Sequence, residues 1–155
     1  MQFRRIGQLV AATTVSAVAL SGAQAVAQEN KTTISVTNIT DIHGHLEDKI
    51  GDPAKAGDEI GVARLQTLIK QVNEGQEFNL TSSGDNVGGS AFVSAISDDK
   101  YTLEALNQMG MKVSAVGNHE FDKGTEDLTE RIQPNSTYPI LGANVLKDGQ
   151  PLLEP

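Results

Sequence analysis

Apolar and polar positions along the chain repeat with two different periods, which predict strands and helices in turn. Residues 31–39 are rich in β-branched side chains, and Ile34 and Val36 alternate with hydroxyl-bearing neighbours, as is typical of a strand. In residues 61–73, apolar side chains recur at spacings of three and four, which indicates an amphipathic helix. The same reasoning predicts further strands over 78–81, 111–116 and 138–141, and further helices over 101–109 and 125–132.

These elements alternate strictly from strand to helix, beginning and ending with a strand. Such an order predicts an α/β fold in which helices cross over between parallel strands. Glycine-rich or charged loops are expected over 40–61 and 82–90, and Thr125 is positioned to cap the helix that follows it. Residues 149–155 show no helix or strand pattern, so the chain is expected to end before the fold is closed.

The first 27 residues have the pattern of a signal peptide. Arg4 and Arg5 form a basic start, residues 9–20 are apolar, and small residues follow, with cleavage expected after Ala27 or, as the alternative, after Ala25. The apolar stretch is too short for the roughly 30 Å hydrocarbon core of a membrane. We therefore expect no transmembrane segment and an exported protein that is periplasmic, on the cell surface or extracellular. An ordinary buried helix and a twin-arginine signal are the alternatives.

Composition narrows the possible partners of the protein. The whole chain has a net charge of −8, which leaves no basic face for phosphate backbones, so a nucleic-acid polymer is not an expected partner. Cysteine is absent, which excludes disulfides, thiolate metal sites and a thiol nucleophile. Any metal ligands must therefore be His, Asp, Glu or Asn, and a bound metal would supply the positive charge that attracts a small phosphate ester.

Polar clusters follow three of the predicted strands at the point where each strand ends. Asp41 and His43 follow the first strand, Asp85 follows the second, and Asn118 and His119 follow the third. Ligands of open α/β sheets bind beyond the carboxyl ends of the strands. The sequence therefore predicts that these side chains meet at one rim of the sheet.

Their chemistry suits two divalent metal ions of the Zn, Mn or Fe kind. The two oxygens of Asp85 can bridge a pair of ions, and Asn118 would bind through a neutral carbonyl that leaves positive charge for a phosphate. Two ions can clamp the attacking and leaving oxygens of a phosphoryl displacement, and a water held between them becomes the nucleophile. His119 is positioned to protonate the leaving oxygen, and Asp122 could orient the His119 ring.

The motifs that carry these residues resemble those of a known family. Residues 41–45 read Asp-Ile-His-Gly-His, Asp85 follows a glycine, and residues 115–122 read Ala-Val-Gly-Asn-His-Glu-Phe-Asp. Together they resemble the calcineurin-like metallophosphoesterases, and in particular the exported 5′-nucleotidase and UDP-sugar hydrolase branch, which includes 2′,3′-cyclic phosphodiesterases. The resemblance covers residues 33–145 and implies a sandwich of two sheets flanked by helices.

Carried over position by position, the resemblance assigns roles to six residues. It implies that Asp41 and His43 bind the first metal, that Asp85 bridges both metals and that Asn118 binds the second. It also implies that His119 and Asp122 form the catalytic dyad. The alternative for Asp122 is a helix cap; His45 is expected to be structural, and Glu120 is not expected to bind metal.

The sequence departs from the family pattern in its histidines. The family completes its metal site with further histidines, including a late Gly-His-x-His segment. This chain has His43, His45 and His119, and none follows His119. We therefore expect residues 28–155 to be the truncated N-terminal portion of a catalytic domain, incomplete in this chain and without the nucleoside-binding domain of the branch.

The predicted activity is two-metal hydrolysis of phosphate monoesters, with nucleoside 5′-monophosphates as the favoured substrates. This portion alone is expected to be inactive. One alternative is a secreted, catalytically incompetent domain that binds metal or a partner, which the missing histidines favour. Another, within the family, is hydrolysis of 2′,3′-cyclic nucleotides or nucleotide sugars, since the substrate pocket lies outside this sequence.

Overall fold

The computed structural model describes residues 32–48 and 59–155, and these residues contain a parallel sheet flanked by helices. Its four strands are hydrogen-bonded in sequence order: β1 (Val36–Ile39), β2 (Asn79–Ser82), β3 (Met111–Ala115) and β4 (Ile140–Leu141). The predicted α/β class and all four predicted strands are confirmed. The signal peptide expected over residues 1–27 lies outside the described residues.

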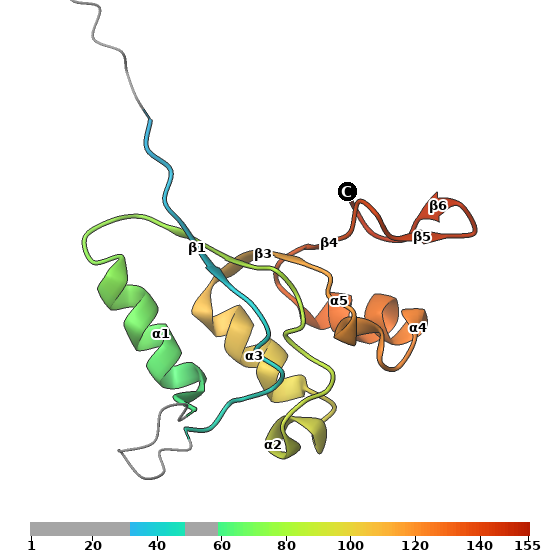
Figure 1. Cartoon of the computed structure of the whole chain (residues 1–155), viewed down its shortest axis with the longest axis horizontal. Helices are drawn as coiled ribbons and strands as arrows, with labels where there is room; N and C mark the ends of the chain where they lie inside the picture. The colour runs from blue at the N-terminus through green and yellow to red at the C-terminus, as the bar shows by residue number, and fades with distance from the viewer. Residues whose placement is uncertain (1–31, 49–58) are drawn as a thin grey trace, which may run out of the picture. The chain divides into compact units, whose positions relative to one another are not determined.

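The crossover helices pack on one face of this sheet. The first two are α1 (Gly61–Val72) and α3 (Lys100–Met109), as the sequence predicts. Because parallel crossovers are right-handed and the strands follow chain order, successive helices leave the same face. Figure 1 shows α1 and α3 on the same side of the strands.

The helix predicted over 125–132 is longer and less regular than expected. It begins as α4 (Thr125–Asp127), passes through the π-helical turn η2 (Leu128–Ile132) and ends as α5 (Gln133–Asn135). Pro134 has no N–H to donate, which favours a change of hydrogen-bond pattern just before it. The predicted cap is wrong: the hydroxyl of Thr125 donates to Glu126 Oε2 at 2.9 Å, and Gly124 occupies the N-cap position.

A short antiparallel hairpin follows β4, where we expected no regular structure. It pairs β5 (Leu146–Lys147) with β6 (Gln150–Pro151). Asp148 and Gly149 connect the two strands with φ values of 53° and 77°, which two-residue hairpin turns require and which Asp-Gly adopts readily. Beyond it Glu154 bridges to Leu141, so the last residues return to the main sheet.

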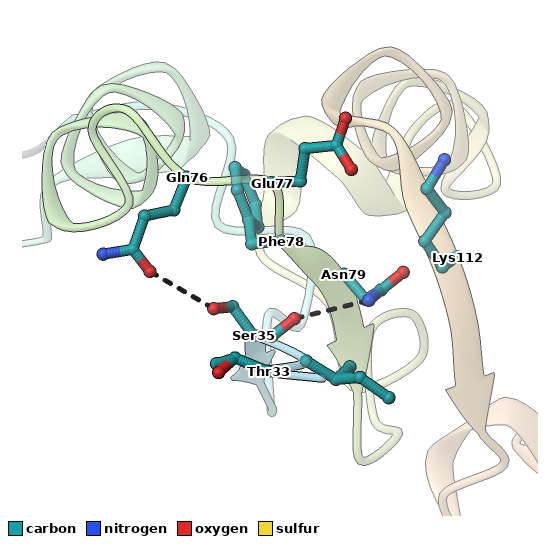
Figure 2. Close-up of a pocket in the computed structure, with 8 residues that line it drawn as sticks. Thr33, Ser35, Gln76, Glu77, Phe78, Asn79 and Lys112 are labelled. Atoms are coloured by element: carbon teal, nitrogen blue, oxygen red, sulfur yellow. Dashed lines mark hydrogen bonds between the residues drawn. The ribbon is translucent and has the colours of Figure 1, made fainter. Parts of the chain in front are cut away.

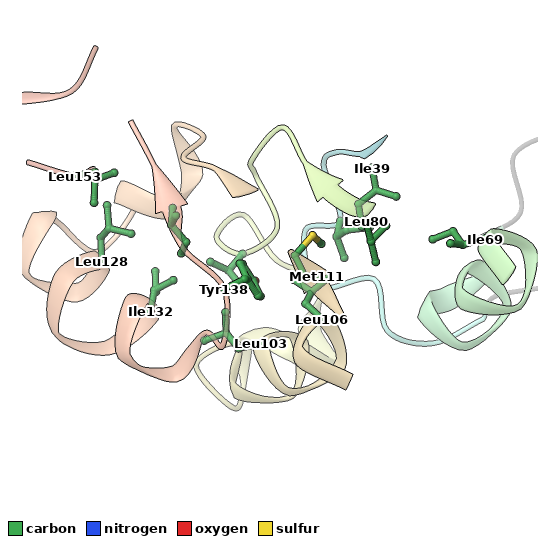
Figure 3. Close-up of a cluster of buried hydrophobic side chains, with 13 residues drawn as sticks. Ile39, Ile69, Leu80, Leu103, Leu106, Met111, Leu128, Ile132, Tyr138 and Leu153 are labelled. Atoms are coloured by element: carbon green, nitrogen blue, oxygen red, sulfur yellow. The ribbon is translucent and has the colours of Figure 1, made fainter. Parts of the chain in front are cut away.

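The core lies between the sheet and its helices. Figure 3 shows its side chains, which come from strands, helices and the C-terminal segment alike. Its most buried members are Leu106, Leu128 and Val87, which are at most 1% exposed. This core fixes the carboxyl ends of the strands, from which the polar loops emerge.

The core members are Ile39, Ile42, Ile69, Leu80, Val87, Leu103, Leu106, Met111, Leu128, Ile132, Tyr138, Ile140 and Leu153. Two further short helices stand near the sheet's carboxyl edge. These are α2 (Phe92–Ala95), which the sequence analysis did not predict, and the 3₁₀ turn η1 (His119–Phe121).

Candidate metal centre

The loops that follow β1 and β2 run side by side beyond the sheet. The N–H of Asp41 donates to the carbonyl of Gly84 at 3.1 Å, and the N–H of His43 donates to the carbonyl of Asp85 at 3.2 Å. These bonds continue the pairing of the parallel strands past their ends. Residues that the sequence separates widely are thereby held next to one another.

Three predicted metal ligands meet at this point. One ligand atom each of Asp41, His43 and Asp85 lies within 4.8 Å of the others. All three have positive φ, at 54°, 43° and 54°. This backbone conformation is uncommon for residues other than glycine, and it tends to occur where surrounding structure fixes a functional side chain. Two carboxylates and an imidazole are a donor set that fits a divalent transition metal.

The imidazole of His43 is held in one tautomer. Its Nδ1 lies 2.7 Å from the carbonyl oxygen of Gly88. Because a carbonyl can only accept, Nδ1 carries the proton and Nε2 keeps its lone pair. Nε2 is 3.7 Å from Asp41 Oδ1, so the free lone pair is on the side of the carboxylates. Such a bond to the far nitrogen is the usual way in which proteins orient a metal-binding histidine.

Asn118 lies on the neighbouring loop, beyond β3, and its side chain is exposed. That loop contacts the Asp85 loop closely: a Cβ added at Gly117 would collide with Asp85 Oδ1, so only glycine fits there. The N–H of His119 donates to the same Asp85 oxygen at 2.9 Å. Gly117 and His119, the residues on either side of Asn118, thus both lie against Asp85.

His119 and Asp122 form a hydrogen-bonded pair next to these ligands. His119 Nδ1 is 3.0 Å from Asp122 Oδ2, and this bond raises the pKa of His119 above its ordinary value. The same bond lowers the pKa of Asp122, whose Oδ2 also accepts the N–H of Gly89 at 2.8 Å. The carboxylate therefore orients the ring, and no helix-capping bond from it occurs among the described residues.

The pair is continuous with the predicted metal ligands. The rings of His43 and His119 meet edge to face, with centroids 4.8 Å apart. A cavity of about 150 Å³ adjoins the pair and is lined by His119, Asp122 and Lys123 among others. All six predicted site residues thus lie on three adjoining loops at the carboxyl ends of β1, β2 and β3.

Two buried carboxylates support these loops, and the sequence analysis assigned a role to neither. Glu120 is 3% exposed and accepts backbone N–H groups from the loops after β2 and β3. Asp99 is 4% exposed; it accepts from the Ser94 hydroxyl at 2.6 Å and from the N–H of Gly88 at 3.3 Å. The position of Glu120 directly after two site residues was the available sequence clue.

His45 lies apart from this cluster, as expected. Its Nδ1 is 2.8 Å from Glu59 Oε2, and the two form a partly exposed ion pair when the ring is protonated. The metal-ligand cluster found among residues 32–48 and 59–155 does not include His45.

A larger pocket, of about 540 Å³, lies at the opposite end of the sheet. Figure 2 shows its lining by residues that precede β1 and β2, including Ser35, Gln76 and Phe78, and by Lys112 of β3. Volume alone would favour it as a binding site. It offers no imidazole and a single carboxylate, Glu77, so the chemistry points to the carboxyl ends of the strands instead.

No helix in the described part of the chain is long and apolar enough to cross a membrane.

Comparison with solved structures finds the same fold in the NAD nucleotidase of Haemophilus influenzae. The TM-score is 0.62 at 21% identity, over 74% of this chain and 21% of that chain.

Comparison of sequences finds relatives of much greater length. The bovine 5′-nucleotidase is 29% identical over 121 residues, which cover 75% of this chain and 21% of that protein. A cell wall protein of Listeria monocytogenes is 30% identical over 148 residues, which cover 87% of this chain and 19% of that protein. The chain therefore spans about a fifth of the length of these relatives.

The Calcineurin-like phosphoesterase family matches residues 34–153, which include the three loops and all six site residues. The match covers most of the chain, and the parallel sheet agrees with it. The chain therefore belongs to the calcineurin-like phosphoesterase family.

Proposed function

We propose that these loops form part of the active site of a two-metal phosphomonoesterase of the 5′-nucleotidase kind. The observation that carries the proposal is the convergence of Asp41, His43 and Asp85 within 4.8 Å of one another, on two loops far apart in sequence. Asp41 and His43 would hold one divalent ion, Asp85 would contact both, and Asn118 would hold the other. Bound divalent ions neutralise phosphate charge and activate water as a nucleophile.

In this proposal His119 supplies the proton that the leaving oxygen takes up. Nδ1 of His119 is hydrogen-bonded to Asp122. This bond raises the pKa of the ring, which favours its protonated form. Nε2 is then left to donate a proton to a leaving alkoxide, as a general acid does. The neighbouring cavity offers space for that part of a substrate.

Nucleoside 5′-monophosphates are the proposed substrates. The support for this choice is the likeness to the bovine 5′-nucleotidase, which this chain matches over about a fifth of its length. Cyclic nucleotides and nucleotide sugars also react by attack of water at phosphorus, but they are diesters and diphosphates, so a substrate comparison distinguishes them. The complete activity is proposed for a protein in which these loops are accompanied by any further metal ligands that the site needs.

The test is phosphate release from AMP with and without MnCl₂, in the 155-residue chain and in any longer natural form. We expect Mn²⁺-dependent release of phosphate in the form that has a complete set of metal ligands. The Asp85→Asn variant of that form should lose this release. Glu104→Gln, an exposed change on α3, is the matched control and should retain activity. Hydrolysis of 2′,3′-cyclic AMP to a nucleoside monophosphate, or of UDP-glucose to UMP and glucose 1-phosphate, in preference to hydrolysis of AMP would reassign the substrate. Mn²⁺ binding without hydrolysis in every form would favour the incompetent domain.

We also propose that residues 1–27 direct export. Their basic and apolar segments support this, as does the likeness to a Listeria cell wall protein. N-terminal sequencing of the protein recovered outside the cytoplasm should begin at Gln28. A mature protein that starts at Met1 would contradict the proposal.

A further inference from the structure

Glu120 is an ionisable residue that lies almost completely inside the molecule. It is 3% exposed and occupies the middle of the turn η1, between His119 and Phe121. Burial of a carboxylate is costly unless hydrogen bonds replace its water. A buried carboxylate that remains must therefore have several donors around it.

Those donors are all backbone N–H groups of the site loops. Oε2 accepts from Gly117 at 2.7 Å and from Asp85 at 3.0 Å. Oε1 accepts from Asn86 at 2.8 Å and, at the longer distance of 3.5 Å, from Val87. One side chain on the loop after β3 thus binds successive backbone groups of the loop after β2 as well as its own loop.

The bonds act on the residues that bear the proposed metal ligands. Asp85 presents its N–H to Glu120 while its Oδ1 accepts the N–H of His119. Gly117, whose N–H also points to Glu120, directly precedes Asn118. The backbones of Asp85 and of the Asn118 loop are therefore fixed relative to each other through a single carboxylate.

We propose that Glu120 is a positioning residue that holds Asp85 and Asn118 in the arrangement that binds metal. It does so as a shared acceptor of backbone N–H groups and not as a metal ligand. This inference rests on the proposed function, because it assumes that Asp85 and Asn118 bind metal. It predicts that metal affinity depends on a side chain that never contacts the metal.

Replacing Glu120 with glutamine tests the role as a hydrogen-bond acceptor separately from the size of the side chain. Glutamine has nearly the same shape, but one of its terminal atoms donates and cannot accept. With the amide in one orientation, the donors Asp85 and Gly117 lose their acceptor. In the other orientation, Asn86 and Val87 lose theirs. Either way, backbone groups of the loops are left without a partner.

The experiment compares Mn²⁺ affinity of the wild-type chain, Glu120→Gln and Leu106→Ala by titration calorimetry under conditions where all three are folded. Leu106 is fully buried on α3 and bonds to neither loop, so Leu106→Ala is the control for loss of stability alone. We expect Glu120→Gln to weaken Mn²⁺ binding by about tenfold or more beyond the control, as loss of a ligand's supporting contact typically does. Glu120→Asp, which keeps the charge on a shorter side chain, replaces Glu120→Gln if that variant does not fold.

A second readout needs no metal. Hydrogen exchange at the N–H groups of Asp85 and Gly117, relative to that of Leu80 in β2, should speed up in Glu120→Gln and not in Leu106→Ala. Equal Mn²⁺ affinity in Glu120→Gln and Leu106→Ala would overturn the inference while the proposed function stands. Failure of the wild-type chain to bind Mn²⁺ would count against the proposed metal site itself, and the inference would fall with it.

Discussion

Single residues at this site take their orientation from hydrogen bonds that end on the backbone or on a carboxylate. His43 is bonded to a carbonyl and His119 to Asp122, so each ring is fixed through Nδ1 and has Nε2 free for chemistry. The two rings differ in their partner. His43 bonds to a neutral carbonyl, whereas the carboxylate beside His119 favours the charged form of that ring and raises its pKa.

This difference predicts the effect of Asp122→Asn on His119. Loss of the carboxylate should lower the pKa of His119 towards its ordinary value, because the bond to Asp122 is the largest cause of the rise. NMR titration of the ring protons in metal-free buffer measures the pKa. Asp148→Asn, in the distant hairpin turn, is the control and should leave the titration of His119 unchanged. An unaltered pKa in Asp122→Asn would show that the pair does not form.

The same shifts set the pH range in which the pair stabilises the fold. The raised pKa of His119 makes its contribution complete below about 6.5 and lost as pH rises through the folded value. The lowered pKa of Asp122 makes its contribution present above about 4 and lost on acidification. The difference in Tm between wild type and Asp122→Asn should therefore be largest between these two pH values and shrink as the pH moves above or below them.

Tyr138 should titrate late because it is buried. Burial raises its pKa to about 12, and the side chain is 5% exposed, against 54% for Tyr101. Absorbance in the near ultraviolet, where tyrosinate absorbs, should show a step near this pH that Tyr138→Phe removes and Tyr101→Phe retains. By linkage, stability from Tyr138 is complete below about 10 and is lost as pH rises towards about 12. Ionisation of Tyr138 near pH 10 in the folded chain would contradict this burial.

At the residue level, the sequence predicted the side chains that follow strands and missed those that support them. Asp41, His43 and Asp85 were predicted because strand ends converge in any parallel sheet. No supporting role was predicted for Glu120 or Asp99, since sequence shows an acidic residue without showing which backbone groups surround it. Only the folded loops reveal that both are buried.

Among the elements, α3 shows how a helix ends before the strand that follows it. Gly110 ends it with φ of 79° and ψ of 35°, and a Cβ added at this position would have no neighbouring atom within 4 Å. A side chain here therefore meets no neighbour and costs only backbone strain. Gly110→Ala should lower the free energy of unfolding by about 1 kcal/mol. Urea titration measures this, with exposed Gln108→Ala expected to change stability by less than about 0.5 kcal/mol; equal effects would contradict the left-handed cap.

The elements were predictable in type and less so at their ends. Strand β1 pairs only from Val36 onwards although the predicted strand begins at residue 31, because pairing depends on the partner strand as well as on pattern. Strand β6 was missed because Gln150 and Pro151 carry no strand pattern. The Asp148-Gly149 turn was the usable signal, since this dipeptide favours a two-residue hairpin.

In the molecule as a whole, the residues that stabilise the fold and the polar residues of the candidate site occupy different parts of the sheet. Helices and core lie on one face of the sheet, while the three polar loops occupy its carboxyl edge and are joined by backbone bonds and buried carboxylates. Asp41, His43 and Asp85 bring two carboxylates together there. Without a cation these charges repel one another, so an ion that binds them should stabilise the folded state of the whole domain.

Thermal unfolding measures this coupling between site and fold. A ligand that binds only the native state adds about 2.7 kcal/mol when its free concentration is about 100 times its Kd. We therefore expect MnCl₂ to raise the Tm of the wild-type chain in a concentration-dependent way. Asp85→Asn should lose most of that rise, because an amide is a weaker ligand, yet its oxygen can still accept the N–H of His119. Glu104→Gln removes one exposed charge elsewhere and should keep the full rise. If Mn²⁺ stabilised Asp85→Asn as much as wild type, the ion would be acting through general charge screening, and the carboxyl edge of the sheet would not be its site.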